Sequence, residues 1–149
     1  MKKIETSIII NSTPTHVWNI ITDFENYAQW NPFIQSITGK KEKGGTLTVK
    51  IAPEGMKPQT FKPEILEFKT DQELKWAGKL FIKGLFDGEH YFQLNRLNDN
   101  QVQLVHGERF RGLLVNPIFK KIGAATLSGF EAMNRAVKDR AELQKQSLI

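Results

Sequence analysis

The stretch GLFDGEHYFQLNRLNDNQVQLVHGERF, residues 84–110, determines the fold that the rest of the chain must accommodate. Two runs of alternating apolar and polar residues flank the turn-forming triplet Asn-Asp-Asn, and this pattern predicts a β-hairpin. If Leu97 lies opposite Gln101, the apolar residues of both strands share one face. A shift by one residue would set that face against residues such as Gln103 and Arg109, so the sequence favours the first register.

This register brings a histidine and a glutamate together on the apolar face. His90 and Glu108 lie directly opposite each other, with roughly 5 Å between their Cβ atoms. A buried glutamate without a partner is costly, whereas a paired one is tolerated. We therefore interpret the face as the lining of a partly polar cavity rather than as part of a solid core.

The sequence leaves four roles open for His90 and Glu108. They are a structural hydrogen bond that fixes the register, a polar anchor for a ligand headgroup, an acid/base pair, and, together with His106, a metal site of two histidines and a carboxylate. No nucleophile or oxyanion motif accompanies the pair, and the spacing of the three residues is not diagnostic of a metal. We predict no metal site and assign no catalytic residue.

The remaining segments place this hairpin in an antiparallel sheet. Alternating or β-branched runs predict five further strands, which makes seven in all, with short connections. Thr13 or Ser12 is expected to cap a first short helix with Pro14 in its first turn, and a second short helical segment ends before Pro32. The five further strands are expected at residues 3–10, 33–39, 46–53, 59–68 and 73–80.

The C-terminal segment predicts one long amphipathic helix. Asn116 is the expected cap, Pro117 suits the first turn, and the pattern continues to about Gln146, a length of roughly 40–45 Å. Gly123 and Gly129 interrupt it, either to permit close approach of another surface or as tolerated imperfections. The apolar stripe consists of Phe119, Ile122, Thr126, Phe130, Met133, Val137 and Ala141.

Composition excludes several classes of protein. The 149 residues suit a single domain over 1–149, and no apolar run approaches the ~20 residues of a membrane-spanning helix. The N-terminus lacks the pattern of a signal peptide, so we expect a cytoplasmic protein. The chain has no cysteine, which excludes disulfides and thiolate chemistry. The net charge of +5 is spread along the chain without a basic stripe, so we expect no nucleic-acid partner, and no cofactor motif is present.

Four strings together resemble the START-like superfamily, also called SRPBCC. They are TPTHVWNIITDFENYAQWNPF (13–33), WAGKLFIKGLFDGEHYFQL (76–94), HGERFRGLL (106–114) and GFEAMNRAVKDRAE (129–142). The chain is most similar to the branch described as polyketide cyclase/dehydrase and lipid transport. The resemblance implies an α+β helix-grip fold, in which a curved, seven-stranded antiparallel sheet wraps around the C-terminal helix, with two short helices after the first strand.

The resemblance also implies a cavity between the sheet and the long helix for a hydrophobic or amphipathic small molecule, such as a lipid, an aromatic or a polyketide-like compound. We expect a binder or carrier that does not insert stably into membranes. A cyclase or dehydratase and a protein-interaction module related to Hsp90 activators are the alternatives, the latter favoured by a filled interior. The ligand and the oligomeric state are not specified. The predicted ligand contacts are His90, Glu108, His106, Phe92, Phe110, Trp76, Trp30, Phe130, Met133 and Val137.

Overall fold

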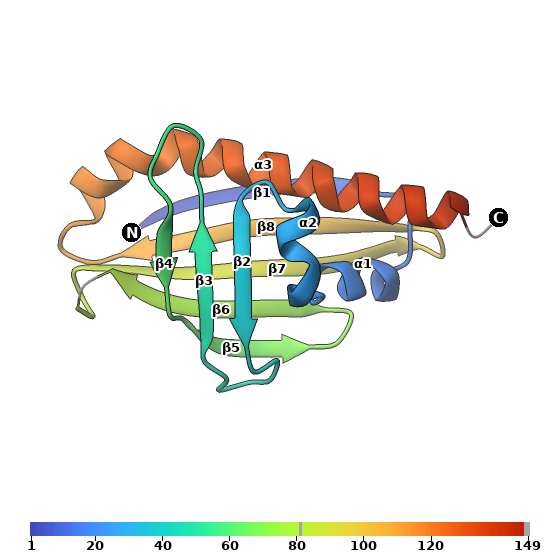
Figure 1. Cartoon of the computed structure of the whole chain (residues 1–149), viewed down its shortest axis with the longest axis horizontal. Helices are drawn as coiled ribbons and strands as arrows, with labels where there is room; N and C mark the ends of the chain where they lie inside the picture. The colour runs from blue at the N-terminus through green and yellow to red at the C-terminus, as the bar shows by residue number, and fades with distance from the viewer. Residues whose placement is uncertain (81, 148–149) are drawn as a thin grey trace.

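The computed structural model describes residues 1–80 and 82–147, which form an α+β fold with eight strands in two antiparallel sheets (Figure 1). The strands are β1 (Lys2–Ile10), β2 (Ile34–Gly39), β3 (Leu47–Ile51), β4 (Gln59–Phe61), β5 (Glu64–Lys69), β6 (Glu73–Leu80), β7 (Phe86–Asn98) and β8 (Gln101–Arg111). The first sheet has the order β1–β8–β7–β6–β5 and the second the order β2–β3–β4. Figure 1 shows the short strands of the second sheet running across the long strands of the first.

The two sheets meet at one corner, where β3 and β5 begin. The Leu47 N–H donates to the Pro63 carbonyl and the Ile65 N–H donates to the Gly45 carbonyl, each at 2.8 Å. The segment 59–68, predicted as one strand, is divided here into β4 and β5 because proline has no N–H to continue a ladder. The strand count is therefore eight rather than seven, and the curved wall is made of two joined sheets.

Two short helical segments follow β1, as the sequence predicts. The helix α1 (Pro14–Ile21) begins after Thr13, whose hydroxyl accepts a hydrogen bond of 3.1 Å from the backbone N–H three residues on. A 3-10 turn, η1 (Phe24–Asn26), leads into α2 (Tyr27–Trp30), which ends at the extended Asn31. This segment carries the chain from the first sheet to the second.

The strands β7 and β8 pair in the predicted register over nearly all of their length, and His90 lies opposite Glu108. The register departs from the prediction only at the turn. There Asn98, and not Leu97, faces Gln101, because β7 contains a bulge. Leu97 is 49% exposed at this point, so the irregularity leaves the interior face unchanged.

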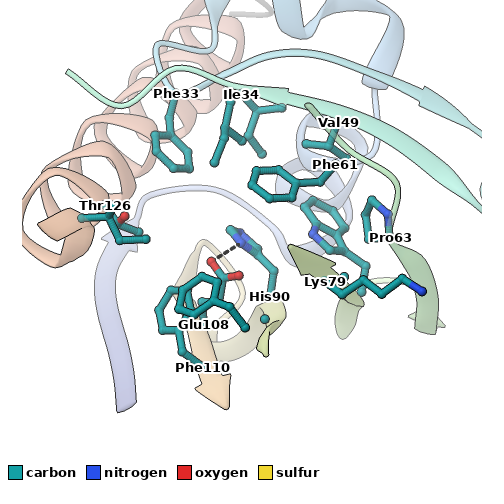
Figure 2. Close-up of a pocket in the computed structure, with 16 residues that line it drawn as sticks. Phe33, Ile34, Val49, Phe61, Pro63, Lys79, His90, Glu108, Phe110 and Thr126 are labelled. Carbon is teal, nitrogen blue, oxygen red and sulfur yellow. Dashed lines mark ion pairs between the residues drawn. The ribbon is translucent and has the colours of Figure 1, made fainter. Parts of the chain in front are cut away.

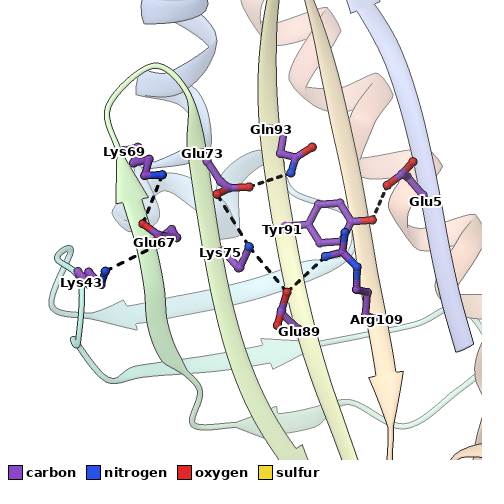
Figure 3. Close-up of polar contacts among 10 residues, drawn as sticks. All are labelled: Glu5, Lys43, Glu67, Lys69, Glu73, Lys75, Glu89, Tyr91, Gln93 and Arg109. Atoms are coloured by element: carbon purple, nitrogen blue, oxygen red, sulfur yellow. Dashed lines mark hydrogen bonds and ion pairs between the residues drawn. The ribbon is translucent and has the colours of Figure 1, made fainter. Parts of the chain in front are cut away.

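The outer face of the first sheet carries a network of polar side chains (Figure 3). Tyr91 lies across Gly107, where any Cβ would fall 2.4 Å from the phenolic oxygen, and its hydroxyl donates to Glu5 at 2.5 Å. The Arg109 guanidinium lies 4.4 Å from the centroid of the Tyr91 ring and donates to Glu89 at 3.3 Å. These polar side chains lie on the outer face, and the opposite face of the sheet carries the apolar side chains of the core.

The helix α3 (Val115–Ser147) runs along β1 and β8 (Figure 1). It begins two residues earlier than predicted, at Val115 and not at Pro117, so Asn116 lies in its first turn and is not the residue before it. The predicted stripe faces the interior: Phe119 and Ile122 are partly buried, and Thr126, Phe130, Met133, Val137 and Ala141 are buried. None of the helices in the described parts of the chain is long and apolar enough to cross a bilayer.

Gly129 permits a close contact between α3 and the start of the second sheet. A Cβ at this position would lie 2.2 Å from Cδ1 of Phe33, far inside van der Waals contact. Phe33 is 2% exposed and packs edge-on against Phe130, with 5.5 Å between the ring centroids. At Gly123 the atoms nearest to an added Cβ belong to the Phe119 ring of the same helix, the closest at 3.2 Å. Of these two glycines, Gly129 is the one that close packing requires.

Replacing Gly129 with alanine is expected to lower the free energy of unfolding by about 1–3 kcal/mol, because the displacement of Phe33 from a packed core outweighs the helix propensity that alanine gains. The matched Gly123→Ala change displaces only a ring edge and gains about 1 kcal/mol of helix propensity, so it is expected to be neutral or stabilising. Urea unfolding followed by tryptophan fluorescence compares the two proteins. Equal stability of both variants would contradict this account.

Candidate ligand cavity

A cavity of about 90 Å³ lies between α3, the second sheet and the inner face of the first sheet (Figure 2). Aromatic and aliphatic side chains form most of its wall. Two ionisable side chains, His90 and Glu108, face it from β7 and β8, whereas the Lys79 side chain points away from it (Figure 2). The lining residues are Phe33, Ile34, Val49, Ile51, Phe61, Pro63, Trp76, Gly78, Lys79, Phe86, Gly88, His90, Glu108, Phe110, Ile122 and Thr126.

Four of the ten residues predicted as ligand contacts belong to this lining: Trp76, His90, Glu108 and Phe110. They come from three neighbouring strands, and their side chains share the inner face because paired residues of a ladder point the same way. The hairpin register therefore accounts for the position of three of them. Their contact with a ligand stays a prediction.

The other six predicted contacts lie outside the lining, because packed side chains separate them from the open space. Three rings pack behind His90, with centroids 4.8–5.0 Å from its imidazole, and they belong to Phe92, His106 and Phe130. Two residues further along α3, Met133 and Val137, are fully buried. Trp30 is remote, because it packs edge-on against Tyr27 and lies below the Arg140 guanidinium of α3.

His90 is held in a stack of rings at one wall of the cavity. The Trp76 ring covers it with 4.9 Å between the centroids and 15° between the planes. The residue is 5% exposed. Because burial penalises the charged form, the pKa of His90 falls to about 3. The imidazole is therefore neutral over the whole physiological range of pH.

Glu108 places its carboxyl group beside this imidazole, with 3.4 Å between Glu108 Oε1 and His90 Nδ1 (Figure 2). Its side chain is 21% exposed, on the side of the cavity. Burial raises the pKa of Glu108 to about 8. The opposite strand provides the space for the carboxyl group, because a Cβ at Gly88 would lie 2.3 Å from Glu108 Oε2.

Behind His90, a buried polar network continues through the core. His90 Nε2 and His106 Nε2 are 2.8 Å apart, and His106 Nδ1 is 2.9 Å from Asn134 Oδ1 on α3. The Asn134 amide donates to the Thr6 hydroxyl on β1 at 2.8 Å. Burial, and secondarily the adjacent His90, lower the pKa of His106 well below its usual value. The site can thus present a neutral acid to the cavity while both histidines remain uncharged.

The geometry gives no support to the metal alternative. Both nitrogens of His106 and Nε2 of His90 already have partners within 2.9 Å. In residues 1–80 and 82–147, no three His, Cys, Asp or Glu side chains are grouped so as to hold a metal ion.

Sequence reasoning missed three parts of the site. The second sheet contributes much of the cavity wall, for example Val49 and Phe61, but its position across the first sheet is not encoded in strand periodicity. Gly78 and Gly88 pair across β6 and β7, and glycines inside strands were an available signal of close approach. Asn134 falls on the buried stripe of the long helix, four residues after Phe130, which was an available signal of a buried polar group.

The chain belongs to a family described as polyketide cyclase / dehydrase and lipid transport, whose pattern matches residues 1–142. This agrees with the resemblance seen in the sequence. No curated protein matches the chain in a sequence comparison.

Solved structures share the fold at low sequence identity. The Zhui aromatase/cyclase of a Streptomyces species superposes with a TM-score of 0.77 at 14% identity, over 95% of this chain and 93% of that one. A START superfamily protein of Mycobacterium smegmatis gives 0.72 at 18% identity, over 95% and 98%. A norcoclaurine synthase of Thalictrum flavum, solved with a transition state analogue, gives 0.74 at 12% identity, over 97% and 96%. The helix-grip fold is therefore shown, and the chemistry has to be argued from this chain's own residues.

The titration of Glu108 predicts a fall in stability above neutral pH. An acid whose pKa rises from 4.5 in the unfolded chain to about 8 in the folded protein contributes stability that is fully present below pH 4.5 and is lost as pH rises to about 8. His90, with its pKa lowered from 6.5, acts oppositely: its contribution is present above pH 6.5 and is lost as pH falls. His106, whose pKa is also lowered by burial, acts in the same direction as His90. Between pH 4.5 and 6.5 the loss from Glu108 and the gain from His90 cancel while the gain from His106 remains, so stability is expected to peak near pH 6.5 and to fall towards pH 8 by up to about 1.4 kcal/mol per pH unit.

The variant Glu108→Gln keeps the shape of the neutral acid but does not ionise, so it is expected to lose little stability over the same interval. Glu64→Gln, at an exposed glutamate, is the matched control and should follow the wild type. Urea unfolding at pH 6.5 and pH 8.0 measures all three proteins. Parallel losses in the wild type and Glu108→Gln would show that Glu108 is not the titrating group.

Proposed function

We propose that the protein binds a small apolar molecule in this cavity, with Glu108 and His90 as the polar anchor. One observation carries the proposal: a carboxyl group and an imidazole face an otherwise mainly apolar hollow. Pockets that bind small molecules commonly combine apolar walls with a few convergent polar groups. A purely structural role for the pair would not need the carboxyl group to be 21% exposed to the hollow.

The volume limits the size of what binds. At about 90 Å³ the hollow is smaller than the ~300–1,000 Å³ usual for drug-sized ligands, while roughly 150 Å³ suffices for benzene in an engineered cavity. The cavity therefore suits the end of a longer molecule that leaves through the open side, and it takes a whole single ring only if the ring protrudes through that side or the walls yield slightly. A whole lipid or a multi-ring polyketide would need the walls to move apart.

Acid catalysis is the second candidate function, and the raised pKa of Glu108 favours it. A carboxylic acid that remains protonated near neutral pH is a suitable general acid. The aromatase/cyclase and the norcoclaurine synthase named above show that the fold accommodates enzymes. Loss of turnover in Glu108→Gln, with ligand binding retained, would favour this function over simple binding.

The open cavity favours both of these functions over a protein-interaction module of the Hsp90-activator type, for which a filled interior was the expected sign. Carriage of the ligand between sites and a cytoplasmic location are further parts of the proposal.

Binding is tested by filling the cavity from α3. Thr126 is 5% exposed and faces the hollow (Figure 2). The next residue, Leu127, is 40% exposed and lies outside the lining. Thr126→Phe is expected to weaken the binding of ethylbenzene at least tenfold, because the new ring takes up the space. Leu127→Phe adds a ring to the same helix outside the cavity and should leave binding unchanged.

Protein NMR titrations with ethylbenzene give the dissociation constants, and native mass spectrometry of freshly purified protein reports any ligand that co-purifies. Equal affinity of the two variants would place the ligand elsewhere. No binding by the wild type, and no co-purified mass, would overturn the proposed function.

A further inference from the structure

The buried network fixes the direction of its own hydrogen bonds, starting from β1. The Thr6 hydroxyl donates its proton to the backbone carbonyl of His106 at 2.9 Å. Since a hydroxyl has one proton, its oxygen accepts from the Asn134 NH₂ group at 2.8 Å. The amide oxygen of Asn134 then faces His106 Nδ1 at 2.9 Å, and because that oxygen only accepts, Nδ1 carries the proton.

The same reasoning passes through both imidazoles. His106 is fully buried and neutral, so its Nε2 is an acceptor, and His90 Nε2 at 2.8 Å must donate to it. A neutral His90 then turns an unprotonated Nδ1 towards Glu108 Oε1. Two facing acceptors repel each other, so the Glu108–His90 pair must hold one proton between them. Apolar surroundings disfavour the ion pair and keep that proton on the carboxyl group.

This proton remains available to a ligand. The separation of 3.4 Å between Glu108 Oε1 and His90 Nδ1 is longer than a normal hydrogen bond from a hydroxyl group. The carboxyl group is also the part of the network that faces the cavity, and the absence of a side chain at Gly88 lets its second oxygen lie against that strand. A ligand oxygen in the cavity can therefore accept from Glu108 without breaking a strong bond.

We infer that Thr6, Asn134 and His106 are positioning residues that hold Glu108 as a neutral acid, and that the cavity selects ligands whose polar group is a neutral oxygen acceptor, such as a ketone. An ammonium group has no lone pair for this donor and would require an unpaired carboxylate. A ligand carboxylate would lose its hydration against apolar walls. The inference rests on the proposed function and adds the chemical class of the ligand.

Three probes with one carbon skeleton test the selection at pH 6.5: acetophenone, ethylbenzene and 1-phenylethylamine. The wild type is expected to bind acetophenone about two- to thirteenfold more tightly than ethylbenzene, the range given by one net hydrogen bond. The charged amine is expected to bind most weakly. Glu108→Leu should bind the ketone and the hydrocarbon equally.

The positioning role has a readout of its own. Side-chain ¹⁵N NMR of the wild type is expected to show the proton of His106 on Nδ1 and that of His90 on Nε2. In Asn134→Leu the His106 proton should redistribute between its nitrogens, and the preference for acetophenone should fall at least twofold. Thr6→Val, which removes only the hydroxyl group, serves the same purpose if Asn134→Leu does not fold. Ser7→Ala, at the neighbouring position of β1, is the control.

The outcomes separate the two proposals. Equal binding of all three probes, a preference for the amine, or a His106 proton on Nε2 in the wild type would overturn the inference while leaving the proposed function in place. Failure of all three probes to bind, ethylbenzene included, together with no co-purified mass, would overturn the proposed function and the inference with it.

Discussion

Two imidazole nitrogens lie 2.8 Å apart in the interior of this protein, and most of the site depends on how they share one proton. At this distance one ring must donate and the other accept, because both are too deeply buried to carry charge at little cost. That requirement links four elements of structure. The hairpin supplies the two rings, α3 supplies the amide that orients the inner ring, and β1 supplies the hydroxyl that orients the amide.

The link explains why polar residues are retained in a region that hydrophobic side chains could fill. A buried polar group that loses its partner costs about 1–3 kcal/mol. Each member of the network therefore restricts where the next side chain can lie. A helix that slipped by one residue would remove Asn134 from His106. The network therefore supports a single alignment of the long helix on the sheet, which apolar packing alone specifies less sharply.

The positions of the site that the sequence predicts are those that the alternation of side chains along a strand determines. The pairing of His90 with Glu108 was predictable, since side chains in a hairpin alternate strictly and one register buries the apolar set. The bulge at Leu97 was not, because one added residue near a turn changes nothing in the pattern of the strands. Trp30 was placed in the cavity on its size and chemistry alone, and neither property fixes a position in space.

The second sheet escaped prediction for a related reason. The break at Pro63 could be foreseen as a weak point in a strand, yet the angle at which the next strands cross depends on contacts between residues far apart in the sequence. Asn134 was overlooked because a single asparagine on a long charged helix resembles a solvent-facing residue. Its spacing from Phe130 and Val137, and not its polarity, identifies it as buried.

The contact between Gly129 and Phe33 has a mechanical consequence for the cavity. The helix backbone is already in close contact with the Phe33 ring there, so the two cannot move closer together. Expansion of the cavity for a larger ligand must therefore occur on the opposite side, where Phe61 and Pro63 lie near the corner that joins the two sheets. A larger ligand would therefore displace the margin that carries Phe61 and Pro63, while the contact between Gly129 and Phe33 holds the opposite margin in place.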